Sequence, residues 1–288
     1  LSGGNLRFCT DPPPPHSRRK DRSPKKRSVL EEKIGPRRRD RSSKKRSMQD
    51  KMDSRRKDRT PMMLLGYWDI RGLAQPIRLL LEYAGAEYEE KRYKTGPAPD
   101  YDKSEWLAEK AANPLGLAFP NLPYLVDGDV KLTQTHAIMR YLGRKFKLVG
   151  DSEAEMTRCD LAEQQLADLR SVFVGWSYMA EPQHSQKKAE NMARFTSMLK
   201  AFSDFLGDRP WMAGDKMTYV DFLCYEIFFQ LNVLSSAAFS GLDNLKAYLE
   251  RFQALPAIAA YEKSDHFIKW PFNNNMATYG SRTQNCPF

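Results

Sequence analysis

The sequence predicts a protein of the α/β plus all-α class. A small α/β domain is expected over residues 62–147 and a larger all-helical domain over 148–288, after a disordered basic arm over 1–61. Apolar runs of strand length alternate with helical spacing in the first domain, whereas no convincing strand pattern follows Gly150. The arm contains 21 basic and 8 acidic residues, a net charge of +13, while the other 227 residues carry 25 basic and 28 acidic residues.

The arm is rich in charge and poor in apolar residues. It holds seven prolines and one aromatic residue, so burial cannot offset the conformational entropy lost on folding. The unit that begins at Arg18 (RRKDRSPKKRS) returns at Arg37 and starts again at Arg55, a low-complexity pattern. One hypothesis is unspecific binding of nucleic acid or another anionic surface, or nuclear import. The alternative, which we favour, is a solvated tail or translated sequence upstream of the true start, because Met62-Met63 stands where the globular pattern begins.

Seven elements are expected in the first domain. Gly72 ends the first apolar run, Pro76 fits the first turn of the helix that follows, and Asp127-Gly128 predicts a two-residue hairpin turn. The order βαβ-ββα is that of a thioredoxin-like domain. The elements are a strand at 63–70, a helix at 73–84, a strand at 88–93, a helix at 101–111, strands at 123–126 and 130–132, and a helix at 137–146.

The second domain is expected to contain only helices. Gly207 should close the second of them, and Thr218 followed by Asp221 is close to a capping box at the start of the third. The predicted helices cover 153–180, 187–206, a stretch from 218 onward, 244–253 and 257–263.

Composition argues against several classes of protein. No run reaches the ~18 apolar residues of a membrane helix, and no signal-peptide layout is visible. Four scattered cysteines and four histidines are too few for a disulfide scaffold or a metal centre, so we expect no metal and a reducing, cytoplasmic location. A thioredoxin-type oxidoreductase would carry Cys-x-x-Cys after the first strand, but residues 67–76 contain no cysteine and offer the phenol of Tyr67 instead.

Several separated motifs stand between residue 61 and about residue 280. They are Tyr67-Trp-Asp-Ile-Arg-Gly-Leu-Ala74, Ile77-Arg-Leu-Leu-Leu-Glu-Tyr83, Ala98-Pro-Asp-Tyr-Asp102, Phe119-Pro-Asn-Leu-Pro-Tyr-Leu125, Thr133-Gln134, Arg209-Pro-Trp211 and Asp221-Phe-Leu223. In their order and spacing they resemble those of cytosolic glutathione S-transferases, the mu class in particular. The resemblance implies conjugation of glutathione, as co-substrate and without another cofactor, to small electrophilic, mostly apolar compounds.

The resemblance gives Tyr67 the central role. A thiol with a pKa near 8.5 is only a few per cent ionised at neutral pH, and the thiolate is the nucleophile. By resemblance the Tyr67 hydroxyl donates to the sulfur and so favours the thiolate. The alternative is a tyrosine that only caps the sheet.

By resemblance, a further set of residues surrounds glutathione. Lys103 and Lys110 would pair with the glycyl carboxylate, although the family often has Arg at the first position and two extra residues stand near 111–114. Gln134 and Thr135, at a predicted helix start, would meet the other carboxylate. The whole set is Tyr67, Trp68, Lys103, Trp106, Lys110, Asn121, Leu122, Pro123 (cis), Gln134, Thr135 and Asp168.

The resemblance also implies a homodimer and an electrophile site. Asp168 would reach the glutamyl ammonium of the neighbouring subunit, unless it is one more charge on a solvated helix face, and Phe119 would insert into that subunit. Tyr178 resembles a second catalytic tyrosine that binds oxygen on the electrophile, with ordinary helix packing as the alternative. The expected electrophile contacts are Ile70, Leu73, Val174, Tyr178 and Phe272.

Three functions were weighed. The first is an active homodimeric transferase. The second is a non-catalytic ligand-binding or structural relative, against which the thiol-facing phenol of Tyr67 argues. The third is a nucleic-acid-associated protein with a passenger transferase domain, but an arm with almost no aromatic residues could bind only electrostatically.

Overall fold

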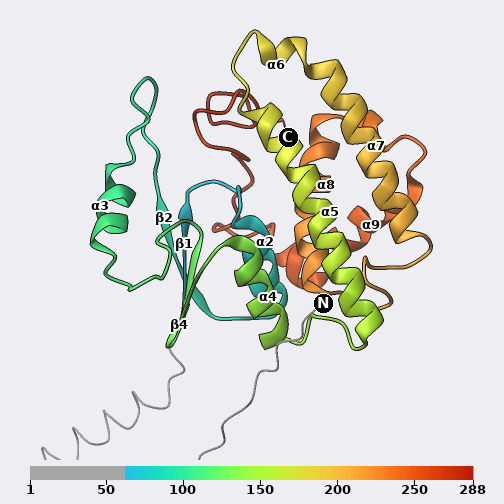
Figure 1. Ribbon diagram of the computed structural model, residues 1–288, viewed down its shortest axis with the longest axis horizontal. Coiled ribbons are helices and arrows are strands. Elements are labelled where there is room, and N and C mark those ends of the chain that lie inside the picture. Colours follow the sequence, from blue (N-terminus) through green and yellow to red (C-terminus); the bar gives the residue numbers. More distant parts are fainter. Residues whose placement is uncertain (1–61, 288) are drawn as a thin grey trace, which may run out of the picture. The chain divides into compact units, whose positions relative to one another are not determined.

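The computed structural model describes residues 62–287 (Figure 1). The predicted basic arm and its repeats lie outside the described residues. The predicted βαβ-ββα domain and the helical domain after it are both confirmed. The first comprises β1 (Met63–Trp68), α2 (Gln75–Tyr83), β2 (Tyr88–Tyr93), α3 (Ser104–Ala112), β3 (Tyr124–Asp127), β4 (Val130–Thr133) and α4 (Thr135–Lys145).

The four strands form one sheet in the order β2-β1-β3-β4. β1 runs parallel to β2 and antiparallel to β3, and β3 and β4 form the predicted hairpin, with Asp127 opposite Val130. A Cβ atom at Gly66 of β1 would lie 2.1 Å from the ring of Tyr124 on β3, so the two strands can pair here only because residue 66 is glycine. Figure 1 shows α3 on one side of the sheet and α2 and α4 on the other.

The second domain is all-helical, as predicted. It comprises α5 (Glu153–Ser177), α6 (Gln183–Gln186), α7 (Lys188–Leu206), α8 (Tyr219–Leu234), the 3-10 helix η1 (Ser236–Phe239), α9 (Asp243–Gln253) and α10 (Pro256–Tyr261). α8 is buried along most of its length and contacts both α2 and α4, so one core joins the sheet layer to the helices. The predicted boundary after residue 147 falls in the loop between α4 and α5.

Two predicted helices differ from the structure by three residues at one end, and the others by at most two. α3 begins at Ser104, three residues later than expected, because Tyr101 has a φ of 47° and the Asp102 carboxylate accepts the Ser104 N–H at 2.9 Å. α5 ends at Ser177 rather than at residue 180. The Ser177 carbonyl accepts N–H groups from Thr278 and Tyr279 instead of continuing the helix. The short helix α6 was not predicted.

Two buried carboxylates fix the helical framework. Thr218 and Asp221 form the predicted capping box at the start of α8. Glu163 of α5 has no exposed surface and accepts hydrogen bonds from Arg140 and from the Tyr219 hydroxyl, beside His136 Nδ1 at 2.7 Å. Burial alone would raise the pKa of Glu163, but these three partners outweigh it and lower the pKa below its ordinary value.

Within the described residues, no helix is long and apolar enough to span a membrane. The same part of the chain contains no group of three or more His, Cys, Asp or Glu side chains placed to hold a metal ion.

Candidate active site

Tyr67 lies at the end of β1, with 5% of its surface exposed. The chain turns sharply after it, and the N–H of Leu73 donates to the Tyr67 hydroxyl oxygen at 2.9 Å. Gly72 makes the turn with a φ of +46°, and a Cβ atom there would lie 2.6 Å from that oxygen. The phenol is thereby held in one position by the backbone of its own turn.

The surroundings of Tyr67 keep its hydroxyl protonated. Burial raises the pKa of Tyr67, and the hydrogen bond from Leu73 and the positive charge of Arg170 oppose this only in part. Because Leu73 occupies a lone pair of the oxygen, the O–H bond remains free to donate to a ligand. The arrangement therefore provides a neutral donor at the mouth of the sheet.

Arg170 is a residue that the sequence analysis missed. It lies on α5, and its charge acts on both Tyr67 and Tyr178. Among the described residues no carboxylate forms an ion pair with it, and burial lowers its pKa. A signal existed in the sequence, since no acidic residue stands three or four positions from Arg170, where a helical ion pair would form.

The turn after β1 is anchored to the helical domain through Arg71. Its guanidinium is 1% exposed and binds the fully buried Glu226 of α8 with two hydrogen bonds, at 2.9 and 2.5 Å. The Arg71 and Gly72 N–H groups donate to the carbonyls of Pro271 and Phe272 at 2.9 Å. Phe272 itself is fully buried, with the Arg71 cation 5.8 Å from its ring centre. Phe272 therefore supports the turn from inside, and its contact with the electrophile stays a prediction.

The predicted partners of the glutathione peptide lie at the ends of several elements. Gln134 immediately precedes α4 and has a φ of 71°, a conformation that non-glycine residues adopt rarely and that often accompanies function. Thr135 is the first residue of α4, where free N–H groups attract a carboxylate. The Leu122–Pro123 peptide bond is cis, as predicted.

The other predicted glutathione residues come from the end of β1, from α3 and the residue before it, and from the segment before β3. Trp106 is 5% exposed and packs against Tyr93 and Tyr124, whereas Trp68, Asn121 and the two lysines are more accessible. The ammonium of Lys103 lies 3.5 Å from the sulfur of Met276 in the C-terminal segment.

A closed turn follows α3, next to the two extra residues that we predicted near 111–114. Asn113 has a φ of 43°, and its side chain exchanges two hydrogen bonds with the backbone of Leu117, at 2.9 and 3.0 Å. α3 ends at Ala112, so Lys110 lies within the helix.

Two of the predicted electrophile residues are bonded to the two tyrosines through their backbones: the Leu73 N–H donates to the Tyr67 hydroxyl, and the Val174 carbonyl accepts the Tyr178 N–H. Tyr178 follows the last residue of α5 and is 36% exposed, and its hydroxyl oxygen accepts the backbone N–H of Asn274 at 3.0 Å. Burial raises the pKa of Tyr178. Leu73 and Val174 are half-buried.

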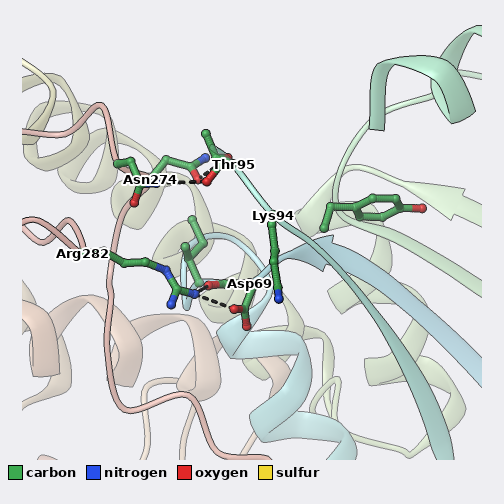
Figure 2. Close-up of a pocket in the computed structure, with 8 residues that line it drawn as sticks. Asp69, Lys94, Thr95, Asn274 and Arg282 are labelled. Atoms are coloured by element: carbon green, nitrogen blue, oxygen red, sulfur yellow. Dashed lines mark hydrogen bonds and ion pairs between the residues drawn. The ribbon is translucent and has the colours of Figure 1, made fainter. Parts of the chain in front are cut away.

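A recess of about 250 Å³ opens beside Ile70 (Figure 2). Its other walls come from the turn after β1, the end of β2 and the C-terminal segment. Figure 2 shows Arg282 linked to Asp69 and Asn274 linked to Thr95. The side chain of Lys94, the residue after β2, is extended (Figure 2).

Two predicted intersubunit residues are exposed in the single chain. The ring of Phe119 is 74% exposed, although Phe is among the residues most often buried. Asp168 lies on an exposed position of α5.

Comparison with known proteins gives a consistent result over most of the chain. Two family models match, the glutathione S-transferase N-terminal domain over residues 63–144 and the glutathione S-transferase C-terminal domain over residues 167–265. Glutathione S-transferase Mu 1 of Rattus norvegicus is 48% identical over 220 residues, which cover 76% of this chain and 99% of the relative. Glutathione S-transferase Mu 3 of Homo sapiens is also 48% identical over 220 residues, 76% of this chain and 96% of the relative. The crystal structure of the glutathione S-transferase Blo t 8 is similar with a TM-score of 0.68 and 36% identity, over 75% of this chain and 99% of that one. The basic arm lies outside both matched ranges.

Proposed function

The chain belongs to the mu class of the glutathione S-transferase family and is a glutathione transferase, and we propose that the Tyr67 hydroxyl stabilises the glutathione thiolate for attack on electrophilic, apolar compounds. The observation that carries this proposal is the hydrogen bond from the Leu73 N–H to the Tyr67 oxygen at 2.9 Å. It leaves the phenolic proton as the one group that Tyr67 can offer a ligand. A raised pKa keeps that proton in place at neutral pH.

The reaction needs few groups. The thiol proton leaves to solvent, the thiolate sulfur attacks the electrophilic carbon, and the leaving group departs with its electron pair. The donor from Tyr67 stabilises the thiolate, and the Arg170 charge lies close enough to act on the same phenol. The proposal also has Tyr178 donate to an oxygen on the electrophile, which is supported by the N–H of Asn274 that already donates to its hydroxyl oxygen.

Glutathione is proposed to lie along the edge formed by α3, the cis Leu122–Pro123 bond and the start of α4. Gln134 and Thr135 would receive the glutamyl carboxylate, and Lys103 and Lys110 the glycyl carboxylate. No described acidic group is ion-paired with either lysine, which supports this assignment.

The same proposal includes a homodimer in which Asp168 completes the partner's site. Phe119 and Leu161, 74% and 58% exposed, are large apolar side chains that a second copy could bury. Cys159 and Cys224 are buried free thiols, which supports a reducing, cytoplasmic setting.

The proposal for Tyr67 is tested by Tyr67→Phe, which removes the hydroxyl and keeps the ring. Loss of one preorganised donor of this kind lowers the rate about 10²–10³-fold. The midpoint of the pH–rate profile with 1-chloro-2,4-dinitrobenzene should rise towards that of free glutathione. Tyr141→Phe, which removes a hydroxyl bound to Asp127 outside the site, is the matched control. An unchanged rate and midpoint in Tyr67→Phe would show that another group activates the sulfur.

The role of Asp168 is tested in a purified heterodimer of Asp168→Asn with Tyr67→Phe. If Asp168 serves the partner subunit, one site carries both defects and the other carries none, so about half of the wild-type activity remains. If Asp168 serves its own subunit, each site carries one defect and activity is nearly lost.

A further inference from the structure

The recess beside Ile70 is lined by residues that adjoin Tyr67 and Tyr178. A Cβ atom built on Gly72 would lie 2.6 Å from the Tyr67 hydroxyl and 3.0 Å from Cδ1 of Ile70, so these two side chains adjoin. On the other side, Asn274 lines the recess, and its N–H is bonded to the Tyr178 hydroxyl. A group bound in the recess would therefore extend from an electrophile placed between the two tyrosines.

The walls of this recess are polar, unlike the apolar shelf predicted from the sequence. Ile70 and Tyr93 contribute apolar surface, and the remaining lining residues are Asp69, Lys94, Thr95, Asn274, Asn275 and Arg282. Two cations and one carboxylate give the lining a net charge of +1. Arg282 donates from Nη2 to Asp69, at 2.5 Å to Oδ2 and 2.6 Å to the backbone oxygen.

Most of the lining groups that are available to bind a ligand in the recess are hydrogen-bond donors. No carboxylate among residues 62–287 is ion-paired with Lys94. The Asn274 carbonyl accepts from the Thr95 hydroxyl at 3.0 Å, which leaves its amide N–H groups available. Asn275 instead donates to the carbonyls of Thr95 and Gly96, both at 3.0 Å, and fixes the C-terminal segment against the end of β2.

We propose that this recess is an anion-binding extension of the electrophile site, so that the enzyme conjugates electrophiles that carry a carboxylate. The inference rests on the proposed function of Tyr67. A cavity of about 150 Å³ accommodates benzene, so 250 Å³ has room for an aromatic ring with a carboxylate. Lys94, Asn274 and the outer N–H groups of Arg282 would bind the carboxylate oxygens, because charge-assisted hydrogen bonds are the stronger ones.

The test uses two matched electrophiles, 4-chloro-3,5-dinitrobenzoate and its neutral primary amide. With either, the glutathione sulfur forms a bond to the ring carbon that carries chlorine, chloride leaves with the bonding pair, and the thiol proton is released to solvent. The measured quantity is the ratio of kcat/KM for the acid to that for the amide. A substitution that affects only the thiolate changes both kcat/KM values by the same factor and leaves this ratio unchanged.

Lys94→Gln should lower the acid-to-amide ratio about fivefold, the effect of one charge-assisted hydrogen bond at an exposed position. Arg282→Gln should lower it further, because the recess loses a cation and the carboxylate of Asp69 keeps only the more distant Arg92, at 3.8 Å, as its counter-charge. In the wild type, salt should lower the acid-to-amide ratio, because it screens the attraction between the cations of the recess and the carboxylate of the acid. The ratio of Lys94→Gln should depend less on the salt concentration. Lys188→Gln, on an exposed position of α7, is the control in which ratio and salt dependence stay unchanged.

An unchanged ratio in both recess variants would overturn the inference. So would a rise in the KM for glutathione with a constant ratio, because the recess would then hold a carboxylate of glutathione itself. Failure of the wild-type enzyme to conjugate the amide and 1-chloro-2,4-dinitrobenzene would contradict the proposed function instead. The two failures are thus distinguishable.

Discussion

The ion pair between Arg71 and Glu226 permits a quantitative test of how the catalytic turn is held. Glu226→Leu removes the carboxylate and leaves the Arg71 guanidinium, which is 1% exposed, without a counter-charge. Its Nε and Nη2 groups would lose their acceptors, while Nη1 would keep the carbonyl of Ile268 at 3.1 Å. Breaking a buried pair in this way costs about 3–5 kcal/mol.

This cost is large enough to measure by two methods. At about 2–4 °C per kcal/mol for a protein of this size, the thermal midpoint should fall by roughly 10 °C. Chemical denaturation should show the same loss at an unchanged m-value. Asp204→Asn, which breaks the exposed pair of Asp204 with Lys200, is the control and should cost less than about 1 kcal/mol.

The double variant Arg71→Met with Glu226→Leu separates the cost of an unpaired charge from the value of the pair. Apolar side chains of similar volume often replace a buried pair at little cost, so the double variant should be more stable than Glu226→Leu alone. The Arg71 side chain already lies 5.0 Å from the ring centre of Phe229, which provides an apolar environment. A loss below about 1 kcal/mol in Glu226→Leu, or purely additive effects, would refute this account of the turn.

Two further predictions concern stability. Gly66→Ala should destabilise the protein by about 1–3 kcal/mol in denaturant titrations, because the new Cβ would lie 2.1 Å from the buried ring of Tyr124. Gly175→Ala should stabilise it by about 0.5–1 kcal/mol, since that helical position has no heavy atom within 4 Å of the new Cβ, and equal effects would contradict both assignments. Glu163 has a lowered pKa when folded, so its stabilisation is complete above the unfolded pKa of about 4.3 and is lost as the pH falls through the folded value. Thermal midpoints measured between pH 7 and pH 3 should therefore fall less in Glu163→Gln than in the wild type, and parallel curves would count against this role.

The elements could be predicted because their signals are local. The hairpin at Asp127-Gly128 and the capping box at Thr218 depend on residues a few positions apart, and the structure contains both. The end of α5 could not be predicted. It depends on hydrogen bonds to Ser177 from residues about one hundred positions later, which no local pattern reveals.

At the candidate site, too, local features could be predicted from the sequence and long-range contacts could not. The position of Tyr67 follows from its place at the end of the first strand. The burial of Phe272 and the pairing of Arg71 with Glu226 depend instead on how the C-terminal segment packs under the turn. The polar recess could not be predicted either, because Asp69 and Arg282 are 213 residues apart in the chain.

These long-range contacts bear directly on the chemistry. In the proposed mechanism Tyr67 donates to sulfur, and its hydroxyl is held by the N–H of Leu73, which follows a turn whose Arg71 and Gly72 N–H groups are bound by the C-terminal segment. The same segment supplies Asn274, which binds Tyr178 and lines the recess. A change in this segment should therefore alter both the activation of the thiol and the choice of electrophile. Substitutions confined to the Lys94 side of the recess should alter the choice of electrophile and leave the activation of the thiol unchanged.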